Sequence, residues 1–168
     1  MKKNGALVSV IMGSDSDLDI MRKTAEMLNK FKIPFEMTVA SAHRSPVRAA
    51  RLASGARQRG IRVIIAAAGH AAHLAGVMAA HTTIPVIGVP IDSSCLKGMD
   101  ALLATVQMPP GIPVATMAIG KPGAANAGIL AAQIIALDDA DLAARLDAFK
   151  GEMEEKVAQK ANRLENSI

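Results

Sequence analysis

The sequence predicts an α/β protein with one parallel sheet and helices on both of its faces. Five short apolar segments alternate along the chain with segments of helical periodicity. The runs at residues 6–12 and 62–67 are apolar almost without interruption, as strands buried on both faces are. Short loops of small and polar residues join these strands to the helices. Such alternation calls for a parallel sheet between two helix layers, with right-handed crossovers.

Each element follows from the pattern of its own segment. The predicted strands span residues 6–12, 34–39, 62–67, 85–90 and 113–119. The predicted helices span residues 18–31, 46–59, 99–107 and 124–137, and Gly60 ends the second of them. A further helix of small residues follows the third strand and ends at His81. Residues 92–98 and 109–111 read as a loop and a turn.

The length of 168 residues suits one domain spanning residues 1–168, with a core at about 6–137 and a C-terminal oligomerisation tail at about 138–168. The tail is charged and predicted to be helical. It carries an apolar stripe made of Leu142, Leu146, Phe149, Met153 and Val157. Such a stripe must cover either its own domain or a neighbouring subunit. Because helix 124–137 is also nearly uncharged, we expect a homo-oligomer.

Composition argues against several classes of protein. The formal charge is +4, but Lys and Arg are interspersed with acids and there is no Trp or Tyr to stack on bases, so we expect a small anionic ligand and not a nucleic acid. No segment has the roughly 18 uninterrupted apolar residues of a membrane helix. The apolar run after Lys2 and Lys3 ends at Met12, which predicts a strand and not a secretion signal. The single Cys95 excludes an intramolecular disulfide and favours a reducing, cytoplasmic setting.

The loop after the second predicted strand brings three kinds of chemistry together. Ser41 offers a hydroxyl, Arg44 a planar set of donors suited to phosphate, and His43 a proton carrier that works near neutral pH. Residues at the carboxyl ends of strands in such sheets face the crevice where ligands bind. A turn with a solvated His and Arg is the alternative.

The loop after the first strand, residues 13–17, is predicted to bind an anion. It precedes a helix, so free N–H groups and the helix dipole favour negative charge there, and Ser14 and Ser16 add hydroxyl donors. Simple N-capping by Ser16 or Asp15 is compatible with this role. Asp17 fits beside a phosphate only if its carboxylate faces sugar hydroxyls.

The loop after the third strand, residues 66–73, is almost entirely Ala and Gly before two histidines. Small residues let the backbone approach a ligand closely. His70 and His73 could join His43 as metal ligands, but no nearby acid or Cys completes such a set, so we predict no metal site. His81 is predicted to be structural, and Cys95 to be an inert small residue.

Five ordered segments resemble one enzyme family, the class I N5-carboxyaminoimidazole ribonucleotide mutases of purine biosynthesis. They are residues 12–17 (MGSDSD), 41–44 (SAHR), 71–74 (AAHL), 107–114 (QMPPGIPV) and 123–127 (GAANA). The resemblance covers about residues 6–137. It implies a three-layer flavodoxin-like fold, an octamer with C-terminal helices packed on neighbours, and carbon dioxide transfer from the exocyclic nitrogen to ring carbon C4 without ATP, metal, biotin or another cofactor.

The resemblance also implies a role for each site residue. The ribonucleotide phosphate would be held by Ser14, Ser16, Ser41 and Arg44, and the ribose hydroxyls by Asp17. His43 would be the general acid/base. The carboxylate or carbon dioxide pocket would be bordered by the small 66–72 loop and the residues after it, with Gly69, His70, Ala71, His73 and Leu74 as substrate contacts.

Two departures from the family pattern leave alternatives open. His70 stands where the family has Gly, and Ala75 where it has Pro; the His70 side chain either points away from the pocket or narrows it. A class II carboxylase, which uses free carbon dioxide, is the first alternative, although Arg44 and residues 71–74 favour class I. A non-catalytic phosphoribosyl-binding module and a flavodoxin-like electron carrier are the others. A carboxyaminoimidazole ribonucleotide synthetase is a possible functional partner.

Overall fold

Five parallel strands form one sheet in the computed structural model, which describes residues 5–167. Residues 1–4, with Lys2 and Lys3, and residue 168 lie outside the described residues. The strands are β1 (Val8–Met12), β2 (Phe35–Val39), β3 (Val63–Gly69), β4 (Val86–Ile91) and β5 (Ala115–Thr116). The helices are α1 (Leu18–Lys30), α2 (Pro46–Ser54), α3 (Leu74–Ala80), α4 (Met99–Val106), α5 (Lys121–Ala136) and α6 (Ala140–Glu165), with 3-10 turns at Asp15–Asp17 and Arg57–Arg59.

The strand order is β2-β1-β3-β4-β5, and every pair is parallel. This is the flavodoxin-like order, in which the chain reverses its direction of travel across the sheet between β1 and β3. The predicted fold class is therefore confirmed. Ligands bind such sheets at the carboxyl ends of the strands beside that reversal.

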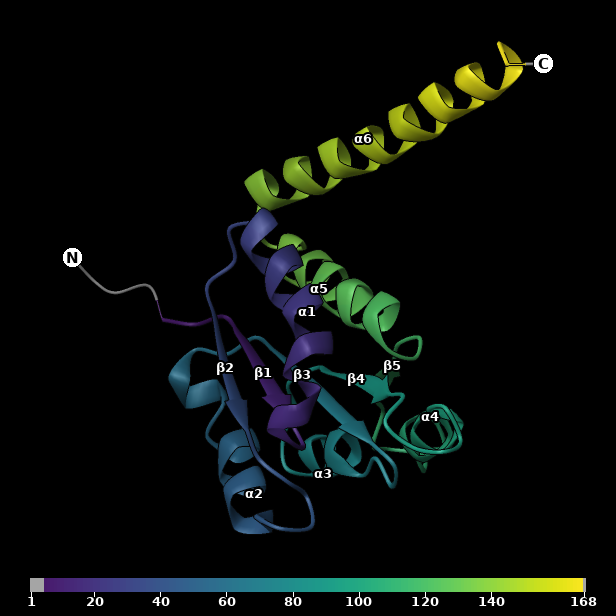
Figure 1. Cartoon of the computed structure of the whole chain (residues 1–168). Helices are drawn as coiled ribbons and strands as arrows, with labels where there is room; N and C mark the ends of the chain where they lie inside the picture. The colour runs from purple at the N-terminus through teal and green to yellow at the C-terminus, as the bar shows by residue number, and fades with distance from the viewer. Residues whose placement is uncertain (1–4, 168) are drawn as a thin grey trace.

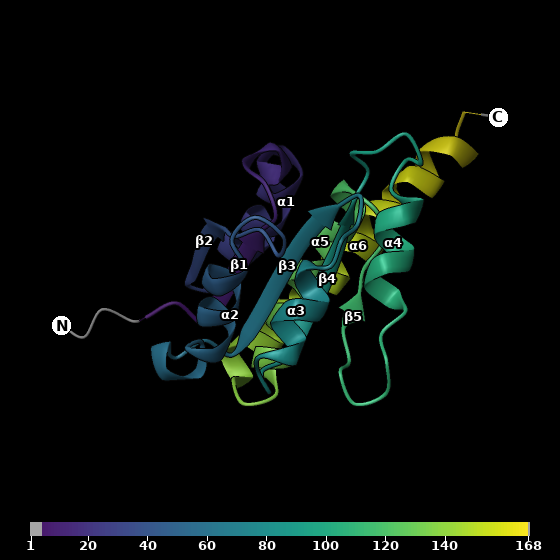
Figure 2. The ribbon, with the colours of Figure 1, turned by 90° about the horizontal axis from the view of Figure 1, so that it is seen from below.

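Helices cover both faces of the sheet (Figures 1 and 2). Alternate strand residues point to opposite faces, so Val10 packs under α1 and α5 while Ile11 packs against α2 and α3. The core is aliphatic, as the composition predicts, with Phe31 as its one fully buried aromatic ring among the described residues. The apolar core layers on the two faces of the sheet thus hold the strand ends, and the loops that follow them, in fixed positions.

Helices α1 and α5 approach each other closely because α5 is made of small residues. A Cβ added at Gly128 would lie 2.9 Å from Met27 Cβ. The buried Thr24 hydroxyl donates a hydrogen bond of 2.6 Å to the Ala124 carbonyl oxygen. The apolar, nearly uncharged α5 is therefore explained in part by packing within its own chain.

Three predicted boundaries are wrong. Strand β5 has two residues and not the predicted seven, residues 113–119. The carbonyls of Gly88 and Pro90 both face this edge and accept from Met117 and Gly120, but Pro90 has no N–H to return, so the regular ladder stops. Helix α2 ends at Ser54 and gives way to a 3-10 turn before Gly60, whose φ of 86° ends it. Helix α5 begins three residues early, at Lys121.

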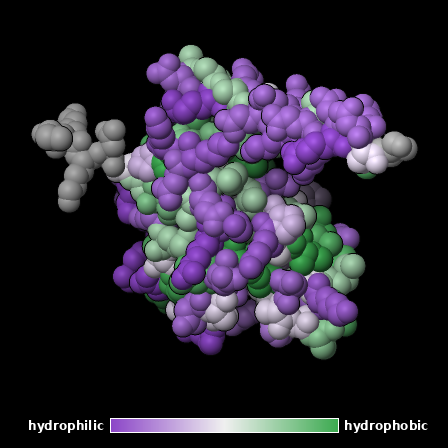
Figure 3. Space-filling view, turned by 45° about the horizontal axis from the view of Figure 1, so that its top comes forward, coloured by the Kyte–Doolittle hydropathy of each residue, from purple (hydrophilic) through white to green (hydrophobic). Residues whose placement is uncertain are grey.

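The first half of α6 packs on its own chain and the second half does not. Leu142 is buried, and the Phe149 ring meets Phe31 edge to face with 5.4 Å between centroids. Beyond this point Met153 and Val157 are 44% and 66% exposed, and the helix projects from the body with mostly hydrophilic residues around a narrow stripe (Figures 1 and 3). Within the described residues, no helix combines the length and the apolar character needed to cross a membrane.

Candidate functional site

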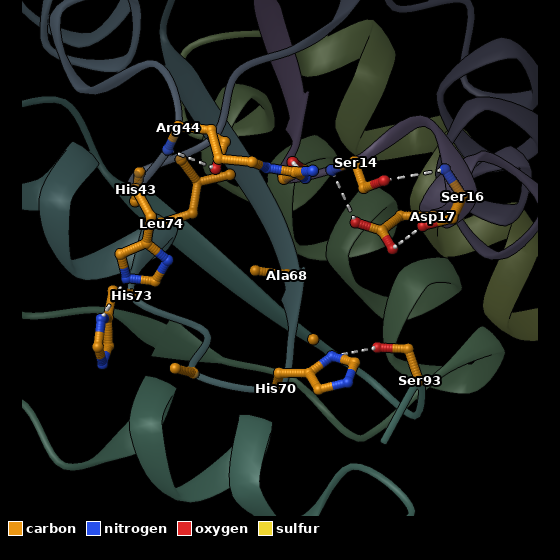
Figure 4. Close-up of a pocket in the computed structure, with 15 residues that line it drawn as sticks. Ser14, Ser16, Asp17, His43, Arg44, Ala68, His70, His73, Leu74 and Ser93 are labelled. Atoms are coloured by element: carbon orange, nitrogen blue, oxygen red, sulfur yellow. Dashed lines mark hydrogen bonds between the residues drawn. The ribbon is translucent and has the colours of Figure 1, made fainter.

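A cavity of about 640 Å³ lies at the carboxyl ends of β1 to β4 (Figure 4). All eleven residues that the sequence singles out line it: Ser14, Ser16, Asp17, Ser41, His43, Arg44, Gly69, His70, Ala71, His73 and Leu74. They come from three loops that are far apart in sequence and meet because parallel strands end at one edge. The volume suits a ligand of nucleotide size.

The loop after β1 is held by reciprocal capping. Ser16 N–H donates to Ser14 Oγ at 3.4 Å, and the Ser14 N–H donates to the Asp17 carboxylate at 3.2 Å. The alternative in which Ser16 or Asp15 provides the cap is therefore wrong, because Ser14 caps the 3-10 turn. These two hydrogen bonds hold the loop backbone in place, and both serines line the cavity.

Asp17 is 4% exposed, although it lies at the cavity wall. Burial raises the pKa of its carboxyl, because the charged form loses hydration; the Ser14 N–H and the Ser16 hydroxyl, 3.4 Å away, oppose this rise. Hydroxyl donors from a ligand would replace part of the lost hydration. The position thus suits binding of a polyol and not of an anion.

We expect the raised pKa of Asp17 to appear when the pH dependence of stability is compared between wild type and Asp17→Asn. Between the ordinary Asp pKa of 3.8 and the raised folded value, the folded state binds more protons than the unfolded state. The free energy of unfolding of wild type, minus that of Asp17→Asn, should therefore fall as pH rises through this window. Urea denaturation at a series of pH values and one protein concentration measures it. A difference that grows with pH would contradict the raised pKa.

The loop after β2 aims Arg44 across the cavity. Its backbone N–H donates to Ser41 Oγ at 3.1 Å, which closes the turn, and its guanidinium Nη2 donates to the Gly13 carbonyl at 3.4 Å. The guanidinium therefore lies beside the β1 loop and Ser14 (Figure 4). Hydroxyls from two loops and a guanidinium from one of them converge on one end of the cavity, an arrangement suited to phosphate.

His43 and His73 form a pair that the sequence did not indicate. His43 Nε2 lies 2.8 Å from His73 Nδ1, and the rings stand at 80° to each other. One of these two nitrogens donates and the other accepts, so the hydrogen bond holds the two rings in a fixed relative orientation. The pair lies at the cavity and can accept and return a proton.

His70 is separated from this pair and turns toward Ser93. Its Nδ1 lies 3.2 Å from Ser93 Oγ, and both residues line the cavity. The ring therefore borders the cavity and does not point away from it, which decides between the two orientations left open by the sequence. Within residues 5–167, no group of three or more His, Cys, Asp or Glu side chains is arranged to hold a metal ion.

Four lining residues were not named individually as contacts: Gly13, Ala42, Ala68 and Ser93, of which Gly13 and Ala68 belong to the loops 13–17 and 66–72 that were predicted to border the ligand. The first three flank predicted residues. Ser93 comes from the loop after β4, for which the sequence predicts only a connecting loop over residues 92–98. Its position just beyond the end of a buried parallel strand was the feature of the sequence that could have indicated a place in the site. Of the described residues, 123–127, His81 and Cys95 do not line this cavity.

The fold and the cavity define an α/β protein of the flavodoxin-like class, with a small-ligand site at the topological switch point of its sheet. Comparison with known proteins narrows this class. The family model described as AIR carboxylase matches residues 7–156. The chain belongs to that family.

Relatives and a solved structure agree. The chain is 55% identical over 152 residues to the N5-carboxyaminoimidazole ribonucleotide mutase of Aliivibrio fischeri, covering 90% of this chain and 94% of that one. It is 52% identical to the mutase of Bacillus subtilis, covering 94% and 98%. The crystal structure of Treponema denticola PurE superposes with a TM-score of 0.86 at 26% identity, covering 95% and 98%.

Proposed function

We propose that this protein is an N5-carboxyaminoimidazole ribonucleotide mutase of purine biosynthesis. It isomerises its substrate to 4-carboxy-5-aminoimidazole ribonucleotide. The observation that carries the proposal is the meeting, in one cavity, of hydroxyl and guanidinium donors at one end with paired imidazoles at another. The names of the relatives agree with it.

The phosphate is bound by Ser14, Ser16, Ser41 and Arg44. Their convergence beside the N-terminus of the segment that leads into α1 supports this role. Asp17 accepts hydrogen bonds from the ribose hydroxyls, which compensates its buried carboxylate. Binding energy from this end of the ligand orients the ring, which lies farther along the cavity.

The reaction exchanges one bond to the carboxyl carbon for another. The bond from the exocyclic nitrogen to this carbon breaks and releases carbon dioxide, and C4 of the ring then bonds to it. His43 gives a proton to the exocyclic nitrogen as the first bond breaks and takes the C4 proton after the new bond forms, so His43 ends as it began and the net reaction is an isomerisation. Contact with His73 at 2.8 Å supports a role for His43 as the acid/base, because that hydrogen bond orients the His43 ring.

The small residues at and after the end of β3 border the space for the carbon dioxide. Ala68, Gly69 and Ala71 line the cavity, so the walls here are formed by backbone and methyl groups. Such apolar walls, covered by the ring of the bound nucleotide, would slow escape of a small neutral molecule and favour its capture by C4. No cofactor takes part in this scheme.

The oligomer and its setting are part of the proposal. Apolar residues are exposed on α4, where Leu103 is 51% exposed, and on α6, where Val157 is 66% exposed, and contacts between copies would cover them. We propose a cytoplasmic homo-octamer that receives its substrate from a carboxyaminoimidazole ribonucleotide synthetase. Sedimentation of the purified protein tests the octamer.

A stopped-flow absorbance assay with two substrates offered separately tests the activity. One is N5-carboxyaminoimidazole ribonucleotide without bicarbonate; the other is aminoimidazole ribonucleotide with bicarbonate and dissolved carbon dioxide. Rapid conversion of the first alone is the expected result. Preference for the second would identify a carboxylase, in keeping with the description of the family model. Activity with neither would leave a binding module.

Removal of the guanidinium should weaken substrate binding. We expect Arg44→Ala to raise KM about 10- to 100-fold with kcat changed only a few-fold, because charge-assisted hydrogen bonds to a non-reacting phosphate contribute about 1.5–3 kcal/mol. Steady-state kinetics measures both constants. Arg48→Ala is the matched control: Arg48 binds Val39 O and Thr38 Oγ1, each at 2.9 Å, and does not line the cavity. Equal effects of the two substitutions would contradict phosphate binding by Arg44.

A further inference from the structure

His70 occupies a backbone conformation that side chains rarely adopt. Its φ is 54°, in the left-handed region, and among the described residues only Lys32 and Lys97 are other non-glycine residues with positive φ. This conformation costs an L-residue about 1–2 kcal/mol. Strain of this kind persists where surrounding contacts fix the residue, and it concentrates at ligand sites.

The strand pairing fixes the partner of His70. Gly69, the last residue of β3, stands in register with Ile91, the last residue of β4, and Ser93 follows two residues later. A Cβ added at Gly69 would lie 2.0 Å from Ser93 Oγ, so the hydroxyl rests directly on the Gly69 backbone. From there it lies 3.2 Å from His70 Nδ1. Two sheet strands therefore orient the imidazole.

This contact leaves Nε2 as the edge of the ring that can bind a ligand. When the Ser93 hydroxyl donates to Nδ1, the ring hydrogen is on Nε2, which then acts as a donor. Asp100, in the first turn of α4, accepts a hydrogen bond of 2.8 Å from the Ser94 hydroxyl. Among the described residues, Ser93 is the hydrogen-bond partner found for the His70 ring.

The position of His70 selects the part of the ligand that it meets. In Figure 4, His70 and Arg44 lie on opposite sides of Ala68, so His70 is remote from the end of the cavity with phosphate donors. A nucleotide bound there by its phosphate presents its base, with the carboxyl group, to the remaining walls. Of these walls, the loop after β3 carries His70 beside Gly69 and Ala71.

We propose that His70, oriented by Ser93, donates a hydrogen bond from Nε2 to the carboxylate of the bound nucleotide and thereby favours carboxylated over non-carboxylated aminoimidazole ribonucleotide. This assignment rests on the proposed function, because it concerns the same cavity. His70 is a specificity residue and not the proton carrier of the reaction. At residue 70, where the backbone conformation favours glycine, this chain carries an imidazole that discriminates between the two ligands.

Titration calorimetry with two ligands tests this assignment. The ligands are 4-carboxy-5-aminoimidazole ribonucleotide and aminoimidazole ribonucleotide, which differ by the carboxylate. His70→Asn keeps a residue that tolerates the left-handed conformation, and we expect it to weaken binding of the carboxylated nucleotide about 10-fold while binding of the other changes less than about two-fold. Ser93→Ala retains the ring but releases it, and should reduce the preference about three-fold. His81→Asn, an exposed histidine outside the cavity, should change neither.

Each outcome has a distinct meaning. An unchanged preference in both variants, or equal weakening of both nucleotides, would overturn the assignment and give His70 a structural role. Ser93→Ala keeps the test valid if His70→Asn fails to fold, because it leaves the backbone at residue 70 unaltered. If wild type binds neither nucleotide, the proposed function fails together with this inference. If wild type binds and turns over its substrate, only the inference is at stake.

Discussion

His43→Ala is expected to lower kcat by about 10²- to 10⁴-fold, the usual contribution of a general acid/base. The imidazole that accepts the C4 proton is lost, and His73 cannot replace it because its Nδ1 is directed at the missing ring, 2.8 Å from Nε2 in wild type. Substrate affinity should change only a few-fold, since the phosphate donors Ser14 and Arg44 lie elsewhere in the cavity. Single-turnover kinetics and calorimetry measure the two effects separately.

The control is another histidine of the same chain. His81→Ala removes an exposed imidazole just beyond α3, outside the cavity, and should leave kcat unchanged. Turnover of His43→Ala within about ten-fold of wild type would refute its role as the acid/base. Loss of binding together with turnover would indicate that His43 instead shapes the cavity.

Strand and helix identity were predictable because apolar periodicity is a local property. The runs that became β1 and β4 are continuous and buried throughout, and that of β3 is buried except at its last two residues, so their apolar sequences indicate buried strands directly. Strand β5 was overestimated because its length depends on Pro90 of a neighbouring strand, which has no N–H to pair. A regular ladder needs donors from both sides, and that information lies outside the segment.

The site was predictable where chemistry follows a strand end. Parallel order alone brings the loops with Ser14, Arg44 and His73 to one edge. Contacts within that edge were not predictable: the pairing of His43 with His73, 30 positions apart, and that of His70 with Ser93 depend on side-chain directions set by packing. The cap at Ser14 was missed because the 3-10 turn begins at Asp15, three residues before the predicted helix start at Leu18.

Gly123→Ala, which adds one methyl group at the start of α5, should cause the largest loss of stability among the substitutions proposed. A Cβ at Gly123 would lie 1.6 Å from the Ala118 carbonyl oxygen, a backbone atom that can move only with the segment between β5 and α5. Gly123 is itself buried, and Ala124 beside it accepts the Thr24 hydroxyl bond. Overpacking of this kind costs about 1–3 kcal/mol or more, and a backbone obstacle places Gly123→Ala at the upper end.

Gly151→Ala is the control, because it makes the same chemical change where nothing lies within 4 Å of the added Cβ. Residue 151 is in the interior of α6, so alanine should stabilise it by about 0.5–1 kcal/mol. The two substitutions should thus shift Tm in opposite directions, with a loss of about 6–12 °C for Gly123→Ala. Thermal unfolding at one protein concentration compares them, since oligomerisation would make Tm depend on concentration. Both glycines are helical and have ordinary negative φ, so backbone strain does not distinguish them. A Gly123→Ala protein as stable as wild type would mean that α5 can move away from the sheet edge. The close packing of α5 on α1 would then not determine the position of the strand-end loops.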